Sequence, residues 1–164
     1  MRARPLVALR WTLPAALVGA AVVVPGAAHS SDGFDAIRAA TDSFHSVAQA
    51  NRAGYLDNEL PCFDSPDGGM GEHLLDGDAI DDNLDPLHPE ALVYEVRPHA
   101  QLRLVAVEYI VPRAPGSDAP TLLGQLFEPV TVGGMDLWTL HAWVWRDNPT
   151  GDFKAYNPMV APCP

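Results

Sequence analysis

Three residues that are far apart in the sequence, His73, Glu108 and His141, carry side chains that need a partner when they are buried. Two imidazoles and one carboxylate are a recurrent ligand set for divalent zinc, iron or copper. We therefore expect the three side chains to meet at one site that binds such an ion, with His45 as a reserve ligand. If one coordination position stays open to water or substrate, such a site can catalyse a reaction. If all positions are filled, it only binds the metal.

The first of these residues, His73, follows a glycine-rich segment over residues 68–71. Glycine allows tight turns and close backbone approach, so the segment is predicted to be a turn that brings the imidazole close to another part of the chain. The alternative is a flexible acidic loop that leaves the histidine exposed to solvent.

Glu108 lies inside the most apolar strand-like segment of the chain, residues 102–111. A carboxylate on the apolar face of a strand either lies at a sheet edge or needs a partner, because burying an unpaired charge is costly. Arg97, Arg103 or a metal ion are the candidate partners. A structural ion pair is the alternative to a metal site.

His141 lies in an alternating segment that places it on one strand face with Trp143 and Trp145. A histidine beside two indoles suits the wall of a small-molecule pocket, which combines aromatic surface with a few polar groups. The second hypothesis is therefore a metal-free binding module, in which Trp143, Trp145 and Met70 line a pocket for a small apolar ligand or a partner segment. A core histidine that donates to a backbone carbonyl is the plainer alternative.

Two other kinds of chemistry have less support in the sequence. The acidic run over residues 76–85 has the oxygen density that Ca²⁺ requires, but it lacks the spacing of an EF-hand and is predicted to be a solvated loop. The chain contains no GxSxG motif, so a serine nucleophile is not indicated.

The elements that would position these residues follow from the periodicity of apolar residues. A helix is predicted over residues 32–53, followed by a long acidic loop over residues 57–85. A helix followed by a run of strands favours an α+β fold, with the N-terminal helix packed against a curved antiparallel sheet, and a small β-barrel is the alternative. Four strands are predicted, over residues 91–96, 102–111, 121–130 and 137–146.

The N-terminal residues indicate export. Three arginines, an uncharged apolar run and small residues before position 28 have the order of a secretory signal peptide, so we expect residues 1–28 to be removed. The rest, residues 29–164, is expected to be a single domain without a membrane anchor, in the periplasm or outside the cell. In that compartment the two cysteines, Cys62 and Cys163, are expected to form a disulfide.

The charge of the mature chain limits its partners. Seven basic and 21 acidic residues remain after residue 28, which gives a net charge of −14. Nucleic-acid binding depends on lysines and arginines that neutralise phosphates, so a nucleic-acid partner is not expected. Anionic membrane surfaces are disfavoured for the same reason, which leaves a metal ion or a small molecule as the expected ligand.

Several motifs resemble those of a family of small secreted bacterial proteins without an established activity. Members of that family combine a GMGxH segment, an LHxWxW strand, an NPxGxF turn and a cysteine near the C-terminus, and this chain has all four. The resemblance implies a single secreted domain but no reaction. It is carried by residues 69–73, 84–86, 89–95, 107–109, 140–145, 148–151 and 157–158.

Overall fold

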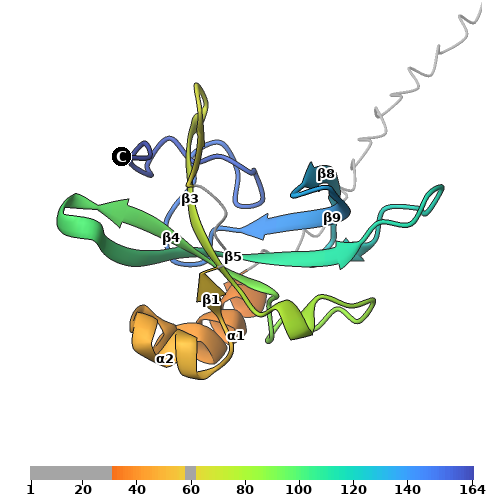
Figure 1. The fold of residues 1–164 in the computed structure, drawn as a ribbon, viewed down its shortest axis with the longest axis horizontal. Helices are drawn as coiled ribbons and strands as arrows, with labels where there is room; N and C mark the ends of the chain where they lie inside the picture. The colour runs from red at the N-terminus through yellow and green to blue at the C-terminus, as the bar shows by residue number, and fades with distance from the viewer. Residues whose placement is uncertain (1–30, 58–61) are drawn as a thin grey trace, which may run out of the picture.

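The computed structural model describes residues 31–57 and 62–164 (Figure 1). The predicted signal peptide over residues 1–28 lies outside this part of the chain. The described residues form an N-terminal helical layer and a strongly curled antiparallel sheet, so the predicted α+β class is confirmed. The path of the sheet runs from β1 to β8 without returning to its start, which makes it an open half-barrel rather than a closed barrel.

The helical layer consists of three short pieces: α1 (Ser31–Thr41), the 3-10 helix η1 (Asp42–His45) and α2 (Val47–Arg52). The prediction of one continuous helix over residues 32–53 is therefore wrong. Ser46 is extended, with φ −95° and ψ 109°, and it separates η1 from α2. The hydroxyl of Tyr94 on the sheet donates to the carbonyl of Phe44, which a continuous helix would use internally. No helix among the described residues has the length and apolar character needed to cross a bilayer.

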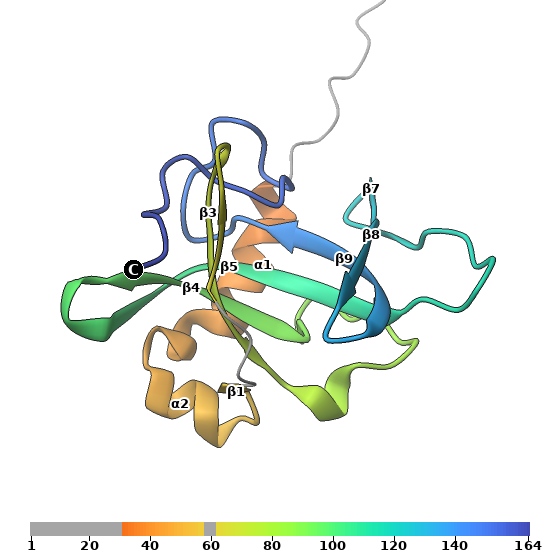
Figure 2. The same ribbon diagram turned by 45° about the horizontal axis from the view of Figure 1, so that its top comes forward.

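The main sheet has the strand order β1-β3-β4-β5-β9-β8, with β2 paired to β3, and a separate hairpin is made of β6 and β7. Figure 2 shows β3 running steeply across β4 and β5, as expected of a strongly twisted sheet. The strands are β1 (Leu56–Asp57), β2 (Phe63–Ser65), β3 (Gly68–Leu75), β4 (Ala91–Arg97), β5 (Gln101–Pro112), β6 (Thr121–Leu122), β7 (Gln125–Leu126), β8 (Glu128–Val132) and β9 (Met135–Ala142).

Two stretches differ from the predicted elements. The acidic loop predicted over residues 57–85 contains strand β3, so the glycine-rich segment before His73 is not a turn. Its glycines instead let the C-terminal segment approach the strand closely. A Cβ atom at Gly69 would lie 2.6 Å from the carbonyl oxygen of Ala161. The single strand predicted over residues 121–130 is replaced by the β6–β7 hairpin and the start of β8.

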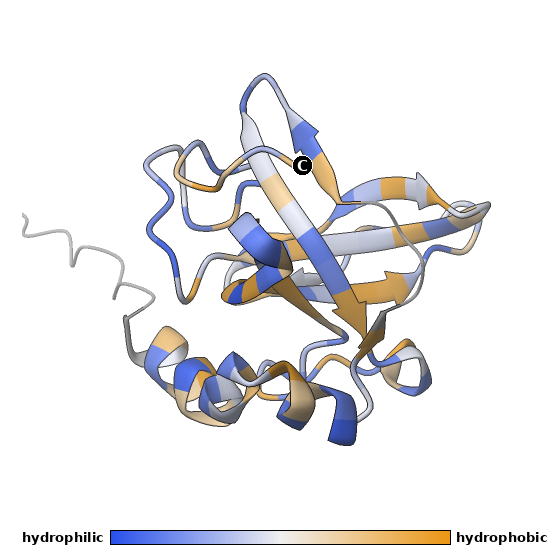
Figure 3. Cartoon of the chain, turned by 60° about the vertical axis from the view of Figure 1, so that its left-hand side comes forward, coloured by the Kyte–Doolittle hydropathy of each residue, from blue (hydrophilic) through white to orange (hydrophobic). Residues whose placement is uncertain are grey.

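The two faces of the sheet bury different groups. The face toward the helices carries the largest apolar cluster, in which Phe34 and Ile37 of α1 pack with Leu92, Tyr94 and Tyr109 of the sheet. Figure 3 shows the helices along one side of the sheet, with hydrophobic residues in both layers. Because side chains alternate along a strand, the residues between these apolar ones point to the opposite face.

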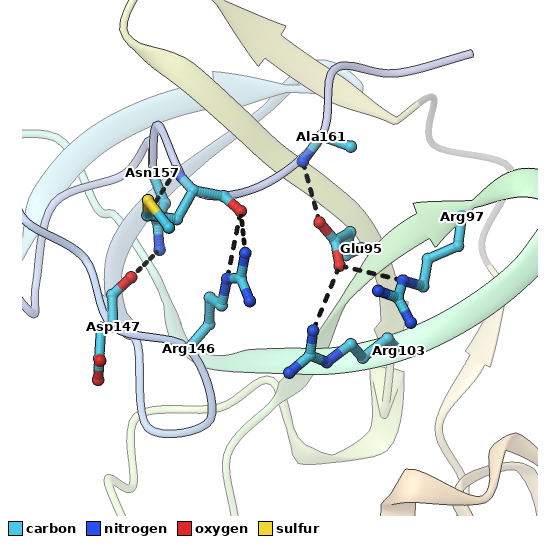
Figure 4. A network of polar contacts seen from close by, with 8 residues as sticks. Glu95, Arg97, Arg103, Arg146, Asp147, Asn157 and Ala161 are labelled. Atoms are coloured by element: carbon cyan, nitrogen blue, oxygen red, sulfur yellow. Dashed lines mark hydrogen bonds and ion pairs between the residues drawn. The ribbon is translucent and has the colours of Figure 1, made fainter.

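The opposite face is partly covered by the C-terminal segment that follows β9. Trp143 and Val160 of this segment pack on Val93 of β4. The backbone N–H of Ala161 donates to the buried carboxylate of Glu95, which ties the segment to the sheet (Figure 4).

A disulfide bonds the C-terminal segment to the part of the chain just before β2. Cys62 is bonded to Cys163, with 5.8 Å between their Cα atoms, so the predicted disulfide is confirmed. The bond joins the residues just before β2 to the end of the C-terminal segment.

Candidate metal centre

The strand register places His73, Glu108 and His141 on one face of the sheet. His73 of β3 is opposite Val93 of β4, and Ala91, two residues before Val93, is opposite Glu108 of β5. Glu108 is in turn opposite His141 of β9. Opposite residues in an antiparallel pair, and residues two apart in one strand, share a face. Three strands that are distant in sequence therefore deliver three ligand-type side chains to one place.

A short side chain leaves room between them. Ala91 lies on the strand between His73 and Glu108, is fully buried, and carries only a methyl group. His73 can therefore reach across β4 toward the carboxylate, and a larger residue at position 91 would occupy that space.

The three side chains approach one another closely. His73 Nε2 lies 3.3 Å from Glu108 Oε2 and 3.4 Å from His141 Nε2, and His141 Nδ1 lies 3.5 Å from Glu108 Oε1. One ligand atom can be chosen from each residue so that all three lie within 4.8 Å of one another. Around a tetrahedral zinc ion, ligand atoms at 2.0–2.2 Å from the metal are separated by about 3.4 Å.

Burial controls the protonation of the two histidines. His73 and His141 are each 4% exposed, and burial lowers the pKa of both to about 4. For His73 the neighbouring carboxylate of Glu108 opposes this shift, and for His141 the charge of Glu128 opposes it. Both imidazoles are therefore neutral at pH 7, which is the form that binds a metal.

The carboxylate responds to the same burial in the opposite direction. Glu108 is 7% exposed, and burial raises its pKa. Protonation of His73 and a hydrogen bond with the Thr139 side chain would oppose this rise. The Thr139 contact also orients the carboxylate, as partners beyond the ligands do in metal sites.

One aromatic ring packs against each of the two imidazoles. Phe63 of β2 packs edge-on against His73, with 5.9 Å between the ring centroids. Trp143 is stacked near His141, with a centroid distance of 6.3 Å and an interplanar angle of 19°. These rings place apolar surface beside the cluster, which lowers the local dielectric.

A pocket of about 190 Å³ opens beside His141. Thr139 and His141 of β9 and Glu128 of β8 line it from the sheet, and Asp152 and Lys154 line it from the C-terminal segment. Of the three cluster residues, His141 is the one that borders this pocket.

No protein-family model, curated protein or solved structure matches the chain.

Of the residues predicted from sequence to belong to the site, His45 and Trp145 lie elsewhere. They pack against each other with 4.3 Å between their ring centroids, and the indole of Trp145 donates to Thr41 of α1, on the helical side of the sheet. The strand alternation predicted through residue 145 stops after Ala142, where the N–H of Val144 bonds back to the Ala142 carbonyl. Trp143 therefore stays with His141, while Trp145 does not.

Met70 and the acidic run have other positions. Met70 is half-buried in β3, outside the residues that line the pocket beside His141. In the acidic run, carboxylates of Asp76, Asp81 and Asp85 each accept a backbone N–H from two residues further on. These contacts stabilise turns. Within residues 31–57 and 62–164, His73, Glu108 and His141 are the only group with the spacing of a metal site.

The arginines considered as partners of Glu108 lie at another carboxylate. Arg97 Nε is 3.6 Å and Arg103 Nη1 is 4.0 Å from Glu95 Oε2 (Figure 4). Sequence reasoning also missed Glu128 and Thr139 of the pocket. Glu128 is followed by Pro129, and only the β8–β9 register shows which face its side chain takes.

Proposed function

We propose that the protein binds a divalent transition metal, with zinc as the first candidate, through His73, Glu108 and His141. The observation that carries this proposal is the convergence of two buried, neutral imidazoles and one buried carboxylate, with one ligand atom of each within 4.8 Å of the others. A divalent cation at their centre would compensate the buried negative charge of Glu108.

The distances favour a metal site over a hydrogen-bonded cluster. Hydrogen bonds between histidines and carboxylates are usually 2.7–2.9 Å long when one group is charged. The two contacts of Glu108 with the histidines are 3.3 Å and 3.5 Å. They are longer than charge-assisted hydrogen bonds, while one ligand atom from each of the three residues lies within 4.8 Å of the other two.

Three protein ligands leave one coordination position of a tetrahedral ion unfilled. Catalytic zinc sites have this composition, including sites with two histidines and one glutamate, whereas structural zinc sites use four protein ligands. The pocket beside His141 supports an exchangeable fourth ligand, either water or a small molecule.

The metal-free alternative rests on the same pocket. Leu126 and Phe153 give it apolar surface, which a small apolar ligand would contact without any metal. The two proposals differ in one measurable respect, because only the first makes ligand binding depend on a metal ion.

We further propose that the protein acts outside the cytoplasm, like the secreted bacterial family that it resembles. The Cys62–Cys163 disulfide supports this, because disulfides persist in oxidising compartments. N-terminal sequencing of secreted protein should begin within a few residues of position 29.

Metal binding is tested by equilibrium dialysis of the metal-free protein against Zn²⁺, with the bound metal counted by elemental analysis. We expect one tightly bound zinc per chain, lost in His141→Ala. The matched control is His88→Ala, because the exposed His88 pairs with Asp85 away from the cluster. Full zinc binding by His141→Ala, or equal loss in both variants, contradicts the proposal.

A further inference from the structure

A second carboxylate lies on the same face of the sheet, one strand beyond the metal centre. Glu128 of β8 is opposite Thr139 of β9, and Thr139 is two residues from His141. Glu128 is therefore the diagonal neighbour of His141 on the face that carries the metal ligands, a separation that long side chains can bridge. Strands β8 and β9 lie side by side at this edge of the sheet (Figure 1).

The environment of Glu128 differs from that of Glu108. Glu108 is buried between the two histidines, whereas Glu128 is exposed and faces the pocket. The charge of Glu128 nevertheless acts on the imidazole of His141. The carboxylate is thus near the metal centre without being one of its three ligands, and it is exposed to the solvent.

Thr139 lies between the two carboxylates on this face of the sheet. Its side chain is hydrogen-bonded to Glu108, and it lines the pocket between Glu128 and His141. The sheet wall of the pocket therefore presents a metal ligand, a hydroxyl and an ionisable carboxylate in sequence along one face.

The volume of the pocket limits the substrate. About 190 Å³ corresponds to about six water molecules and is below the 300–1,000 Å³ typical of sites for drug-sized ligands. Leu126 and Phe153 supply apolar surface, so a small molecule with a short apolar group fits the site better than a polymer.

We propose that this pocket is the active site of a metal-dependent hydrolase for small esters, and that Glu128 is its catalytic base. This inference rests on the proposed metal centre. A metal ion with three protein ligands lowers the pKa of a bound water toward 7, which makes hydroxide available at neutral pH. An ester carbonyl is an electrophile that this hydroxide attacks, and a carboxylate within reach accepts the released proton.

The reaction balances with water as the only co-reactant. The metal-bound water gives one proton to Glu128, and its oxygen forms a bond to the ester carbonyl carbon while the carbonyl electron pair moves onto the carbonyl oxygen. When the carbonyl re-forms, the bond to the alkoxide breaks and the alkoxide takes the proton from Glu128. One ester and one water give one carboxylic acid and one alcohol, and Glu128 is again a carboxylate.

The test measures hydrolysis of p-nitrophenyl acetate by the zinc-loaded protein, with the metal-free protein as the blank. We expect zinc-dependent turnover in the wild type and a fall in kcat of about 10²-fold or more in Glu128→Gln. Bound zinc and KM should stay unchanged in that variant. The control is Asp118→Asn, an exposed carboxylate on the loop before β6, which should keep the wild-type rate.

The outcomes separate the two proposals. Stoichiometric zinc with no turnover above the blank overturns the hydrolase inference and leaves the metal site standing. Turnover that is unchanged in Glu128→Gln removes Glu128 from the role of base. A protein that binds no zinc overturns the metal centre and this inference together.

Discussion

Glu108 and His141 are directly opposite each other in the β5–β9 ladder, and Glu108 Oε1 lies 3.5 Å from His141 Nδ1. The backbone hydrogen bonds of the two strands fix this pairing, so the two ligands are positioned before any ion arrives. Only His73 has to come from a third strand. A site held by three strands is preorganised, which reduces the cost of binding.

Zinc should stabilise the folded protein. A ligand that binds only the folded state at 100 times its Kd raises the free energy of unfolding by about 2.7 kcal/mol. We expect thermal unfolding with and without Zn²⁺ to show a higher Tm with the metal for the wild type and for His88→Ala, and no shift for His73→Ala. A full shift in His73→Ala would show that the stabilising ion lies elsewhere.

The stability of the metal-free protein should depend on Glu90. This carboxylate is 2% exposed, and burial raises its pKa to about 7, while its Oε2 accepts the N–H of Ile110. The folded state therefore binds more protons than the unfolded state between pH 4.5 and about 7. The stability that the protonated group provides is fully present below pH 4.5 and is lost as the pH rises to about 7.

Glu90→Gln removes this titration and keeps an acceptor for Ile110. We expect the variant to gain stability relative to the wild type as the pH rises from 4.5 to 7, by at most about 3 kcal/mol. Urea unfolding at pH 4.5, 6 and 8 measures the difference. An equal difference at all three values would show that Glu90 does not titrate in this window.

Gly71 should be essential for the strand that carries His73. Its φ is +112°, and a Cβ atom there would lie 2.5 Å from the carbonyl oxygen of Tyr94 on β4. Gly71→Ala should therefore destabilise the fold by about 1–3 kcal/mol or more and weaken zinc binding. Gly77→Ala is the control, because nothing lies within 4 Å of a Cβ atom at that position. Equal urea midpoints for the two variants would contradict this.

The disulfide should hold the C-terminal segment over the sheet. The Cys62–Cys163 bond spans 101 residues of sequence, and closing a loop of that length contributes up to about 4–5 kcal/mol in the chain-entropy model. We expect no free thiols in the unreduced protein. Cys62→Ser with Cys163→Ser should lower the urea midpoint, and an unchanged midpoint would show that the remaining contacts of the segment suffice.

Long periodic segments made part of the site predictable from sequence. Glu108 and His141 lie within runs of apolar residues whose alternation indicated strands, and both runs are strands in the structure. The convergence of these two residues with His73 followed from the need of each group for a partner, and the structure brings the three together.

Most differences between the predicted and the observed elements depend on contacts between distant residues. The glycines before His73 indicated a turn, but they let the C-terminal segment and β4 approach a strand, which local sequence does not show. The position of Trp145 depends on a local bond between Val144 and Ala142 that ends the alternation. The face taken by Glu128 depends on the register of β8 against β9.

The most direct test of the metal centre is a crystal structure of the zinc-soaked protein, with diffraction data collected on both sides of the zinc absorption edge. We expect one strong anomalous peak about 2.0–2.2 Å from a nitrogen of His73, a nitrogen of His141 and a carboxylate oxygen of Glu108. A cluster without such a peak, or a peak only at surface groups such as His88 and Asp85, would contradict the central claim.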